Sequence, residues 1–192
     1  MSYTTRALVG AVLIAAGASS AQAQHASLVL RGNSLFVRFQ GPQIIGRAAA
    51  CSLQLQGVPE AQHTQLSRLH AALVVDAGAW SVTDLGSTNG TFVNDKRLTP
   101  WTSAPLADGD QVGLGGFSFE FQVLKAKPRD AVSFDPTMAE KGCAAGAAAD
   151  CAVLGVAYDL GIGVTRDAAR ARKLLQQACA AGYEPACRAP AR

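Results

Sequence analysis

The feature that most constrains the fold is a series of short segments of β-type residues between Ser27 and Leu124, each ending at turn-forming residues. The clearest segment is 117–123, in which phenylalanine or valine alternates with serine, glutamate or glutamine. This period of two is typical of a strand that buries one face. Many short strands separated by regular turns predict a mainly β chain folded as a sandwich or barrel. The other strand-like segments are 35–39, 71–75, 80–84, 92–93 and 96–98, with Asn94-Asp95 predicted as a hairpin turn between the last two.

The composition allows one ordinary domain and a small second one. The chain has 192 residues, of which 49% are hydrophobic and 16% charged, so it can bury a packed core. Its formal net charge of +3 is too small to indicate a nucleic-acid partner. We also find no nucleophile or phosphate-loop motif and no cluster of carboxylates. The sequence therefore does not favour an enzyme, and no cofactor is expected.

Residues 1–24 have the pattern of an export signal. Arg6 precedes an apolar run over 7–18, and the triplet AQA at 21–23 is typical of a cleavage site. The run is too short to span a bilayer and too rich in alanine and glycine for a strand. We therefore expect a signal peptide over 1–23 of a bacterial protein that is periplasmic or secreted. No later segment is apolar enough to span a membrane in the mature chain.

The character of the sequence changes after the last strand-like segment. Segment 125–136 contains two prolines and no periodicity. We interpret it as a linker between a β domain over 26–124 and a helical region over 137–190. Alanine and glycine dominate the helical region, where Asp167 is a natural N-cap for a helix that ends at Gly182.

The helical region contains an internal repeat marked by four cysteines. The sequence CAAG at 143–146 recurs at 179–182, and Cys151 recurs as Cys187, in each case 36 residues later. The spacing within each pair is too wide for the usual zinc half-site and no histidine lies nearby, so no metal site is expected. The spacing suits two antiparallel helices joined by a turn. In an exported protein we expect these disulfides: Cys143–Cys151 and Cys179–Cys187.

Three segments of the β region carry groups suited to an anionic ligand. A phosphate group on a peptide brings nearly two negative charges and three acceptor oxygens. Arg47 can bind phosphate with two parallel hydrogen bonds, and Ser67 can donate its hydroxyl proton. The tight turn 86–90 offers convergent backbone N–H groups, and Asn89 can both donate to and accept from a peptide main chain.

Taken in order, these segments resemble the forkhead-associated (FHA) domain, a β-sandwich that reads phosphothreonine. The resemblance covers about 27–124 and rests on Gly46-Arg47, on Ser67 followed by His70, on 87–94 and on 108–110. It implies a sandwich of about eleven strands with the binding loops at one end. It also implies the site residues: Arg47 and Ser67 for phosphate, Arg68, Ser87, Thr88 and Asn89 for phosphate or peptide, and Gly46, His70, Gly90 and Asn94 as structural residues of the loops.

The segment 48–65 departs from the pattern of this family. An acidic residue is usual a few positions after the arginine, but here CSLQ stands at 51–54. The loop 57–65 is long and polar. We expect Cys51 to be a small buried hydrophobic residue rather than a reactive thiol.

The helical region resembles the SEL-one-like repeat, a tetratricopeptide-like unit, in the cysteine-rich form of secreted bacterial proteins. The resemblance covers about 135–188 and rests on the spacing of small and aromatic residues from Leu154 to Ala171. Helical repeats need about three units to bury their faces, and the second unit here stops at Pro190. Three arrangements are open: the region is stabilised by its disulfides, it docks on the sandwich, or it binds a partner. We favour the first.

Together these patterns predict an exported adaptor with two binding functions. The FHA domain binds a phosphothreonine peptide, and the helical repeats contact a second protein. The alternative is an envelope or secretion component that binds an unphosphorylated protein through the same loops. Phosphate dependence separates the two functions. If residues 1–24 were not an export signal, the paired cysteines would lose their oxidising compartment.

Overall fold

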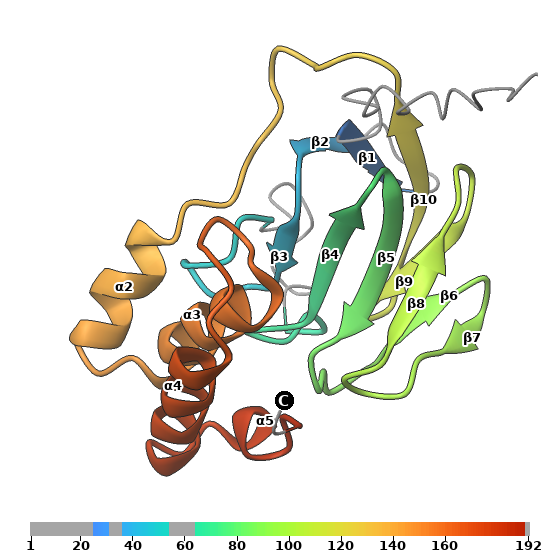
Figure 1. Cartoon of the computed structure of the whole chain (residues 1–192). Coiled ribbons are helices and arrows are strands. Elements are labelled where there is room, and N and C mark those ends of the chain that lie inside the picture. The colour runs from blue at the N-terminus through green and yellow to red at the C-terminus, as the bar shows by residue number, and fades with distance from the viewer. Residues whose placement is uncertain (1–24, 31–35, 54–63, 191–192) are drawn as a thin grey trace, which may run out of the picture.

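The computed structural model describes residues 25–30, 36–53 and 64–190. The predicted signal peptide at 1–23 lies outside the described residues. Within them, two antiparallel sheets form a β-sandwich, and four helices from the C-terminal part of the chain lie together on one side of it (Figure 1). The mainly β fold with a small helical tail that the sequence predicts is confirmed.

The strands are arranged in two sheets in which all neighbours are antiparallel. The six-stranded sheet has the order β2-β1-β10-β9-β6-β7 and consists of β1 (His25–Leu30), β2 (Phe36–Gln40), β6 (Thr91–Val93), β7 (Lys96–Arg97), β9 (Gln111–Leu114) and β10 (Phe117–Leu124). The four-stranded sheet has the order β3-β4-β5-β8 and consists of β3 (Gln43–Ile45), β4 (Ala71–Asp76), β5 (Ala79–Asp84) and β8 (Ser103–Leu106). The described residues hold ten strands, where the family resemblance implies about eleven; Leu53 makes only an isolated bridge to Ile45.

The core between the two sheets is built around aromatic side chains. Trp80 of β5 contacts Phe39 of β2 and Phe121 of β10 edge-on, with ring centroids 5.5 and 5.7 Å apart. In β10, Phe117, Phe119 and Phe121 are buried, while the residues between them are exposed or half-buried. The alternation in the sequence of this strand therefore predicts its buried face correctly.

The predicted hairpin turn is also confirmed. Asn94 and Asp95 have φ of 48° and 64°, so both adopt the left-handed conformation that a two-residue type I′ turn requires. The turn joins β6 to β7, with Phe92 opposite Arg97. The strand-like segments of the sequence do not include β1, which is six residues long, or β3, β8 and β9, which are three or four residues long.

The helical region consists of α2 (Thr137–Ala144), α3 (Ala148–Leu160), α4 (Ala168–Ala180) and α5 (Glu184–Cys187). Asp167 caps α4 as predicted, since its carboxylate accepts a hydrogen bond from the Arg170 N–H at 2.9 Å. Gly146 and Gly182 follow α2 and α4 with φ of 88° and 83°, and both turns have the same three main-chain hydrogen bonds. The recurrence of CAAG in the sequence is thus also a recurrence of local structure.

Two disulfides close the turns of the helical region. Cys143–Cys151 joins α2 to α3 and Cys179–Cys187 joins α4 to α5, which are the pairs that the sequence predicts. Cys51 is the free cysteine among the described residues, and it is buried as expected. In the part of the chain that the structure describes, no helix combines the length and the apolar character needed to cross a membrane.

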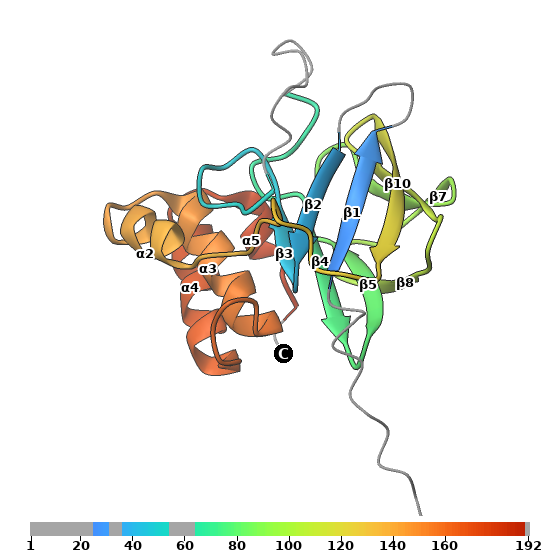
Figure 2. The same cartoon turned by 90° about the horizontal axis from the view of Figure 1, so that it is seen from above.

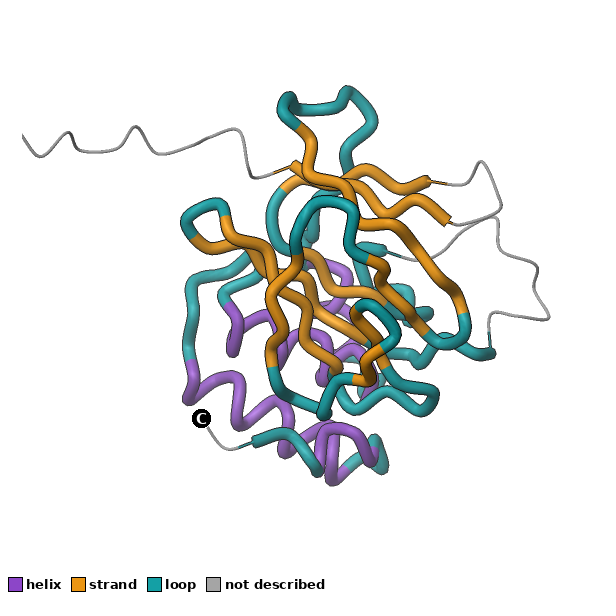
Figure 3. The backbone as a smooth tube through the Cα atoms, turned by 90° about the vertical axis from the view of Figure 1, so that its right-hand side faces the viewer, coloured by secondary structure: helices purple, strands orange, loops and turns teal. Residues whose placement is uncertain are grey.

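The helices cover the outer face of the four-stranded sheet, on the side of β3 and β4 (Figures 2 and 3). Ile45 and Leu73 point into the sandwich core, whereas the neighbouring Ile44 and Ala72 belong to a second core that the sheet shares with the helices. The run 71–75 is apolar throughout because both faces of β4 are buried near its start. The tail is therefore both disulfide-bonded and docked on the sandwich.

Segment 125–136, the predicted linker, is attached to the sandwich. The Val132 N–H donates to the Arg38 carbonyl at 3.0 Å, and the Gln40 N–H donates to the Val132 carbonyl at 2.9 Å. Phe134 then enters the second core beside the helices. The segment thus holds the tail against the sheet instead of acting as a free tether.

Candidate functional site

Two loops next to β3 and β4 are joined by main-chain hydrogen bonds. The Arg47 N–H donates to the Ser67 carbonyl at 3.1 Å, and the Ala48 N–H donates to the Arg68 carbonyl at 3.0 Å. Gly46 lies at the closest approach of the loops, where a Cβ atom would overlap the Arg68 carbonyl. Only glycine fits at this position. The contact brings the side chains of Arg47, Ser67 and Arg68 next to one another.

His70 joins two loops from the buried side. Its Nδ1 accepts from the Ser67 N–H at 3.1 Å. Because a backbone N–H can only donate, the proton of the neutral ring is on Nε2, which donates to the Gly90 carbonyl at 3.2 Å. Burial lowers the pKa of His70 below 6.5, and the nearby Asp84 charge and the Gly90 carbonyl oppose the shift. The ring is therefore a neutral brace between the loops.

The turn after β5 is organised by Asp84, whose side chain is buried. One carboxylate oxygen accepts from the Gly86 and Ser87 N–H groups at 3.1 and 3.2 Å. The other accepts from the hydroxyls of Ser87 and Thr91. The Ser87 hydroxyl in turn accepts from the Gly90 N–H at 3.0 Å, so it is engaged inside the turn.

Ser67 and Asn89 connect this turn to the loop before β4. The Ser67 Oγ accepts from the Thr88 N–H at 2.9 Å. The Asn89 Nδ2 donates to the Gln65 carbonyl at 2.8 Å. Thr88 and Asn89 are exposed and Ser67 is half-buried, so all three present polar atoms to solvent at the same place.

Asn94 has a structural position at the hairpin between β6 and β7. Its Nδ2 donates to the Asp110 carboxylate at 2.8 Å, and its Oδ1 accepts from the Gln111 N–H at 2.9 Å. These bonds attach the hairpin to β9.

A cavity of about 350 Å³ lies where the loops meet the helical tail. Its lining includes four of the residues predicted to contact a phosphopeptide: Arg47, Ser67, Arg68 and Thr88. Ser87 and Asn89 lie outside its described lining. The tail contributes residues 182–185 as a further wall. They comprise the end of the turn after α4 and the first two residues of α5, and we call them the turn 182–185. We call this space the loop–tail cavity.

Tyr183 fastens the tail to the loops. It is 2% exposed, and its hydroxyl accepts from the Leu69 N–H at 3.3 Å. The Arg68 guanidinium lies over the Tyr183 ring, 4.8 Å from its centroid. Burial raises the pKa of Tyr183, which keeps the hydroxyl protonated. The orientation of Arg68 therefore depends on a residue of the tail.

The loop–tail cavity combines two cationic side chains with one carboxylate in its described lining. Arg47 is exposed, and none of the described carboxylates forms an ion pair with it. Arg68 is exposed on the Tyr183 ring, and Glu184 supplies the carboxylate. Cys51 lies beneath the loops and donates to the Arg68 carbonyl at 3.3 Å. Burial raises the pKa of the Cys51 thiol to about 12, so it is a neutral core residue.

The sequence pattern did not single out Asp84, Tyr183 or the turn 182–185. Asp84 was read only as a strand position, although an aspartate directly before a turn containing glycine and serine is a known signal for side-chain bonds to the following N–H groups. Tyr183 has no such local signal. Tyr183 contacts Leu69 and Arg68 only because the tail docks on the sandwich, and the local sequence does not indicate this docking.

The family model described as FHA domain matches residues 44–115 of this chain. Over 116 residues the chain is 34% identical to an oxoglutarate dehydrogenase inhibitor of Corynebacterium efficiens, an alignment that covers 58% of this chain and 75% of that protein. Over 56 residues it is 45% identical to the glycogen accumulation regulator GarA of Mycolicibacterium smegmatis, which covers 29% of this chain.

The chain spans only 34% of the length of GarA. Among solved structures, a chain from a study of phosphothreonine-dependent FHA domain interactions is 29% identical, with a TM-score of 0.43, and the match covers 54% of this chain and 98% of that one.

Proposed function

Because the chain belongs to the FHA domain family, we propose that its loop–tail cavity binds a peptide containing phosphothreonine. Arg47 and Ser67 bind the phosphate, and Thr88 and Asn89 contact the peptide around it. The observation that carries this proposal is the convergence of Arg47, Ser67 and Thr88 from three loops on one cavity.

The chemistry of these three residues suits a phosphate dianion. An exposed guanidinium such as that of Arg47, which has no ion pair with a described carboxylate, can form two parallel hydrogen bonds to phosphate oxygens. The Ser67 Oγ accepts from the Thr88 N–H at 2.9 Å, and its own proton makes only a long hydrogen bond of 3.4 Å to the Thr88 Oγ1, which a phosphate oxygen can replace. The two residues thereby supply the cation and the hydroxyl donor that a phosphate requires.

Arg68 and Asn89 are proposed to contact the ligand beside the phosphate. The ring of Tyr183 supports one face of the Arg68 guanidinium, which leaves the N–H groups at its edge to donate. Asn89 uses its Nδ2 for the Gln65 carbonyl, and its amide oxygen has no partner among the described residues. That oxygen is suited to accept from a peptide N–H.

Ser87 is better assigned to the loop framework than to the ligand. Its hydroxyl donates to Asp84 and accepts from the Gly90 N–H, so a ligand would have to replace bonds that hold the turn. We place it with the other residues proposed to be structural: Gly46, His70, Gly90 and Asn94.

The test is a titration of the purified protein with a phosphothreonine peptide library and its unphosphorylated counterpart. Losing a charged hydrogen bond costs about 1.5–3 kcal/mol, so Arg47→Ala should weaken phosphopeptide binding at least about tenfold. Arg129→Ala, which removes an exposed charge in the segment 125–136, is the matched control. Equal affinity of wild-type protein and Arg47→Ala for the phosphopeptide would contradict the assignment of the site.

We further propose that the protein is exported and acts as an adaptor without enzymatic activity. The two disulfides of the tail support a periplasmic or secreted location, because such bonds persist in oxidising compartments. The two similar proteins are named as a glycogen accumulation regulator and an oxoglutarate dehydrogenase inhibitor, which supports a non-enzymatic role. A reporter enzyme that is active only in the periplasm, fused behind residue 192, tests the location.

The tail is proposed to consist of SEL-one-like repeats that contact a second protein. A hollow of about 340 Å³ between α4 and α5 is the surface proposed for this contact, and its lining combines small apolar residues and Leu175 with the polar side chains of Arg172 and Gln176. The alternative function, binding of an unphosphorylated envelope or secretion protein through the same loops, predicts equal affinity for the two peptide libraries.

A further inference from the structure

The loop–tail cavity is built from two parts of the chain with opposite charge. The sandwich loops contribute Arg47 and Arg68, whereas the tail contributes Glu184. A phosphate is attracted by the arginines and repelled by the carboxylate, so Glu184 does not serve the phosphate itself. Its position in the same cavity suits a cationic group that lies next to the phosphate on the ligand.

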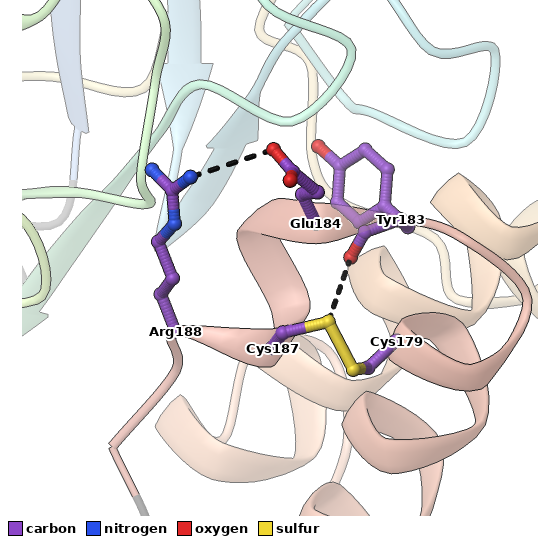
Figure 4. Close-up of polar contacts among 5 residues, drawn as sticks. All are labelled: Cys179, Tyr183, Glu184, Cys187 and Arg188. Carbon is purple, nitrogen blue, oxygen red and sulfur yellow. Dashed lines mark hydrogen bonds and ion pairs between the residues drawn. A yellow bond between two sulfur atoms is a disulfide. The ribbon is translucent and has the colours of Figure 1, made fainter.

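Glu184 is held at the cavity by its neighbours in the turn (Figure 4). Tyr183, the preceding residue, is buried and bonded to the Leu69 N–H. The disulfide Cys179–Cys187 closes the turn from the other side, and the Cys187 sulfur lies 3.9 Å from the Tyr183 carbonyl. The backbone at Glu184 is therefore fixed on both sides.

The carboxylate of Glu184 has a partner that a ligand can replace. It forms an ion pair with Arg188 at 3.4 Å, one helical turn away, and the side chains of Glu184 and Arg188 are 82% and 71% exposed. Exposed pairs of this kind contribute little to stability because water and salt screen them. A lysine or arginine of a bound peptide can thus exchange with Arg188 at low cost.

We propose that Glu184 selects phosphothreonine peptides that carry a lysine or arginine close to the phosphothreonine. This inference rests on the proposed function, because it names the ligand class of the same cavity. The sandwich loops then recognise the phosphate and the tail recognises the neighbouring residue. A carboxylate in the cavity also acts against peptides with an acidic flanking residue.

The experiment measures the affinity of the full chain for two phosphothreonine peptides that differ only in lysine or glutamate at the flanking positions. Wild-type protein should bind the lysine peptide about threefold more tightly, the range of an exposed charge pair. Glu184→Lys should invert this preference. Arg188→Ala removes the competing cation and should strengthen binding of the lysine peptide only.

Glu140→Lys is the matched control, since it makes the same charge change on the exposed surface of α2, away from the described cavity lining. It should leave the preference unchanged. If phosphopeptides bind but Glu184→Lys leaves the preference as in wild-type protein, or changes it no more than Glu140→Lys does, the inference is wrong and the proposed function stands. If no phosphothreonine peptide binds better than its unphosphorylated counterpart, the proposed function fails and the inference fails with it.

Discussion

The two walls of the loop–tail cavity are held in place by different kinds of interaction. The sandwich wall, formed by the loops at 46–48, 67–68 and 86–90, is held by hydrogen bonds to two buried polar side chains, Asp84 and His70. The tail wall, formed by the turn 182–185, is held by a disulfide and by the contacts of Tyr183 with Leu69 and Arg68.

Because of this difference, the two walls should respond to different solution conditions, one to pH and the other to reductant. The hydrogen-bond network of the sandwich wall depends on every partner being present and on the protonation state of His70, whose pKa is lowered by burial. A disulfide is insensitive to mild acid but depends on the redox state of the compartment. Proton concentration should therefore act mainly on the phosphate-binding wall and reductant mainly on the tail wall.

The largest effect is expected for Asp84→Ala. Its carboxylate accepts from two backbone N–H groups and two hydroxyls, and it is 1% exposed. Removing it leaves one buried and three part-buried donors without their acceptor, so the free energy of unfolding should fall by about 3 kcal/mol. Urea denaturation followed by tryptophan fluorescence measures this loss.

Asp76→Ala is the control for this prediction, because Asp76 is an exposed residue at the end of β4. It should change the stability by less than about 0.5 kcal/mol. A loss for Asp84→Ala no greater than that for Asp76→Ala would show that the sandwich wall does not depend on the carboxylate.

The next effect is expected for the two disulfides, which close loops of equal length. Removing either pair by alanine substitution should cost about 2–3 kcal/mol in the chain-entropy model. Only loss of Cys179–Cys187 releases the turn that carries Tyr183 and Glu184. We therefore expect Cys179→Ala/Cys187→Ala to weaken phosphopeptide binding, and Cys143→Ala/Cys151→Ala to lower the stability of the tail with no effect on affinity.

For both double variants, circular dichroism measures the stability of the helical tail and peptide titration measures the affinity for the phosphopeptide. Equal affinity of the two variants would mean that the tail wall takes no part in ligand binding. In wild-type protein, reductant should lower the helical signal while the β-sandwich persists.

Patterns of a few neighbouring residues were enough to predict the structural elements that such short segments determine. The alternation in β10, the Asn94-Asp95 turn and the Asp167 cap are each determined within a few residues, and each is confirmed. The docking of the tail was only one of three open arrangements. The apolar run 71–75 indicates that both faces of a strand are buried, but no periodicity says what covers the second face.

The candidate site also has residues that the sequence predicted and residues that it did not. The order of the motifs along the sequence predicted that Arg47, Ser67 and Thr88 lie in neighbouring loops, and the structure places all three in the lining of one cavity. The same motif could not tell that the Ser87 hydroxyl turns inward to Asp84. The sequence did not predict the role of Tyr183, because its partner Leu69 lies 114 positions away and no local pattern around either residue indicates the contact.

A smaller effect is expected from pH through His70. Burial holds its folded-state pKa below 6.5, so the unfolded chain takes up the proton first as the pH falls. The contribution of neutral His70 is complete above pH 6.5 and is lost as the pH drops below that value toward the folded-state pKa. The stability should fall with a slope that approaches about 1.4 kcal/mol per pH unit in this window.

Urea denaturation between pH 7.5 and 5.5 measures the slope, and His70→Gln provides the comparison. This variant is less stable at pH 7.5 but lacks the titrating ring, so its stability should depend less on pH than that of wild-type protein. Parallel curves for the two proteins would contradict a neutral His70 brace.

The smallest effect is expected where the two walls touch, at Tyr183. Tyr183→Phe removes the hydroxyl that accepts from the Leu69 N–H but keeps the ring under Arg68, so it should cost about 1 kcal/mol of stability with little change in phosphopeptide affinity. Tyr183→Leu also removes the ring and should weaken the phosphopeptide about two- to fivefold, the value of a cation–π contact at an exposed arginine. Titration of both variants separates anchoring of the tail from support of Arg68. If the two variants bind with equal affinity, the tail acts on the sandwich wall through the hydrogen bond alone, and the stacked ring has no part in holding the arginine.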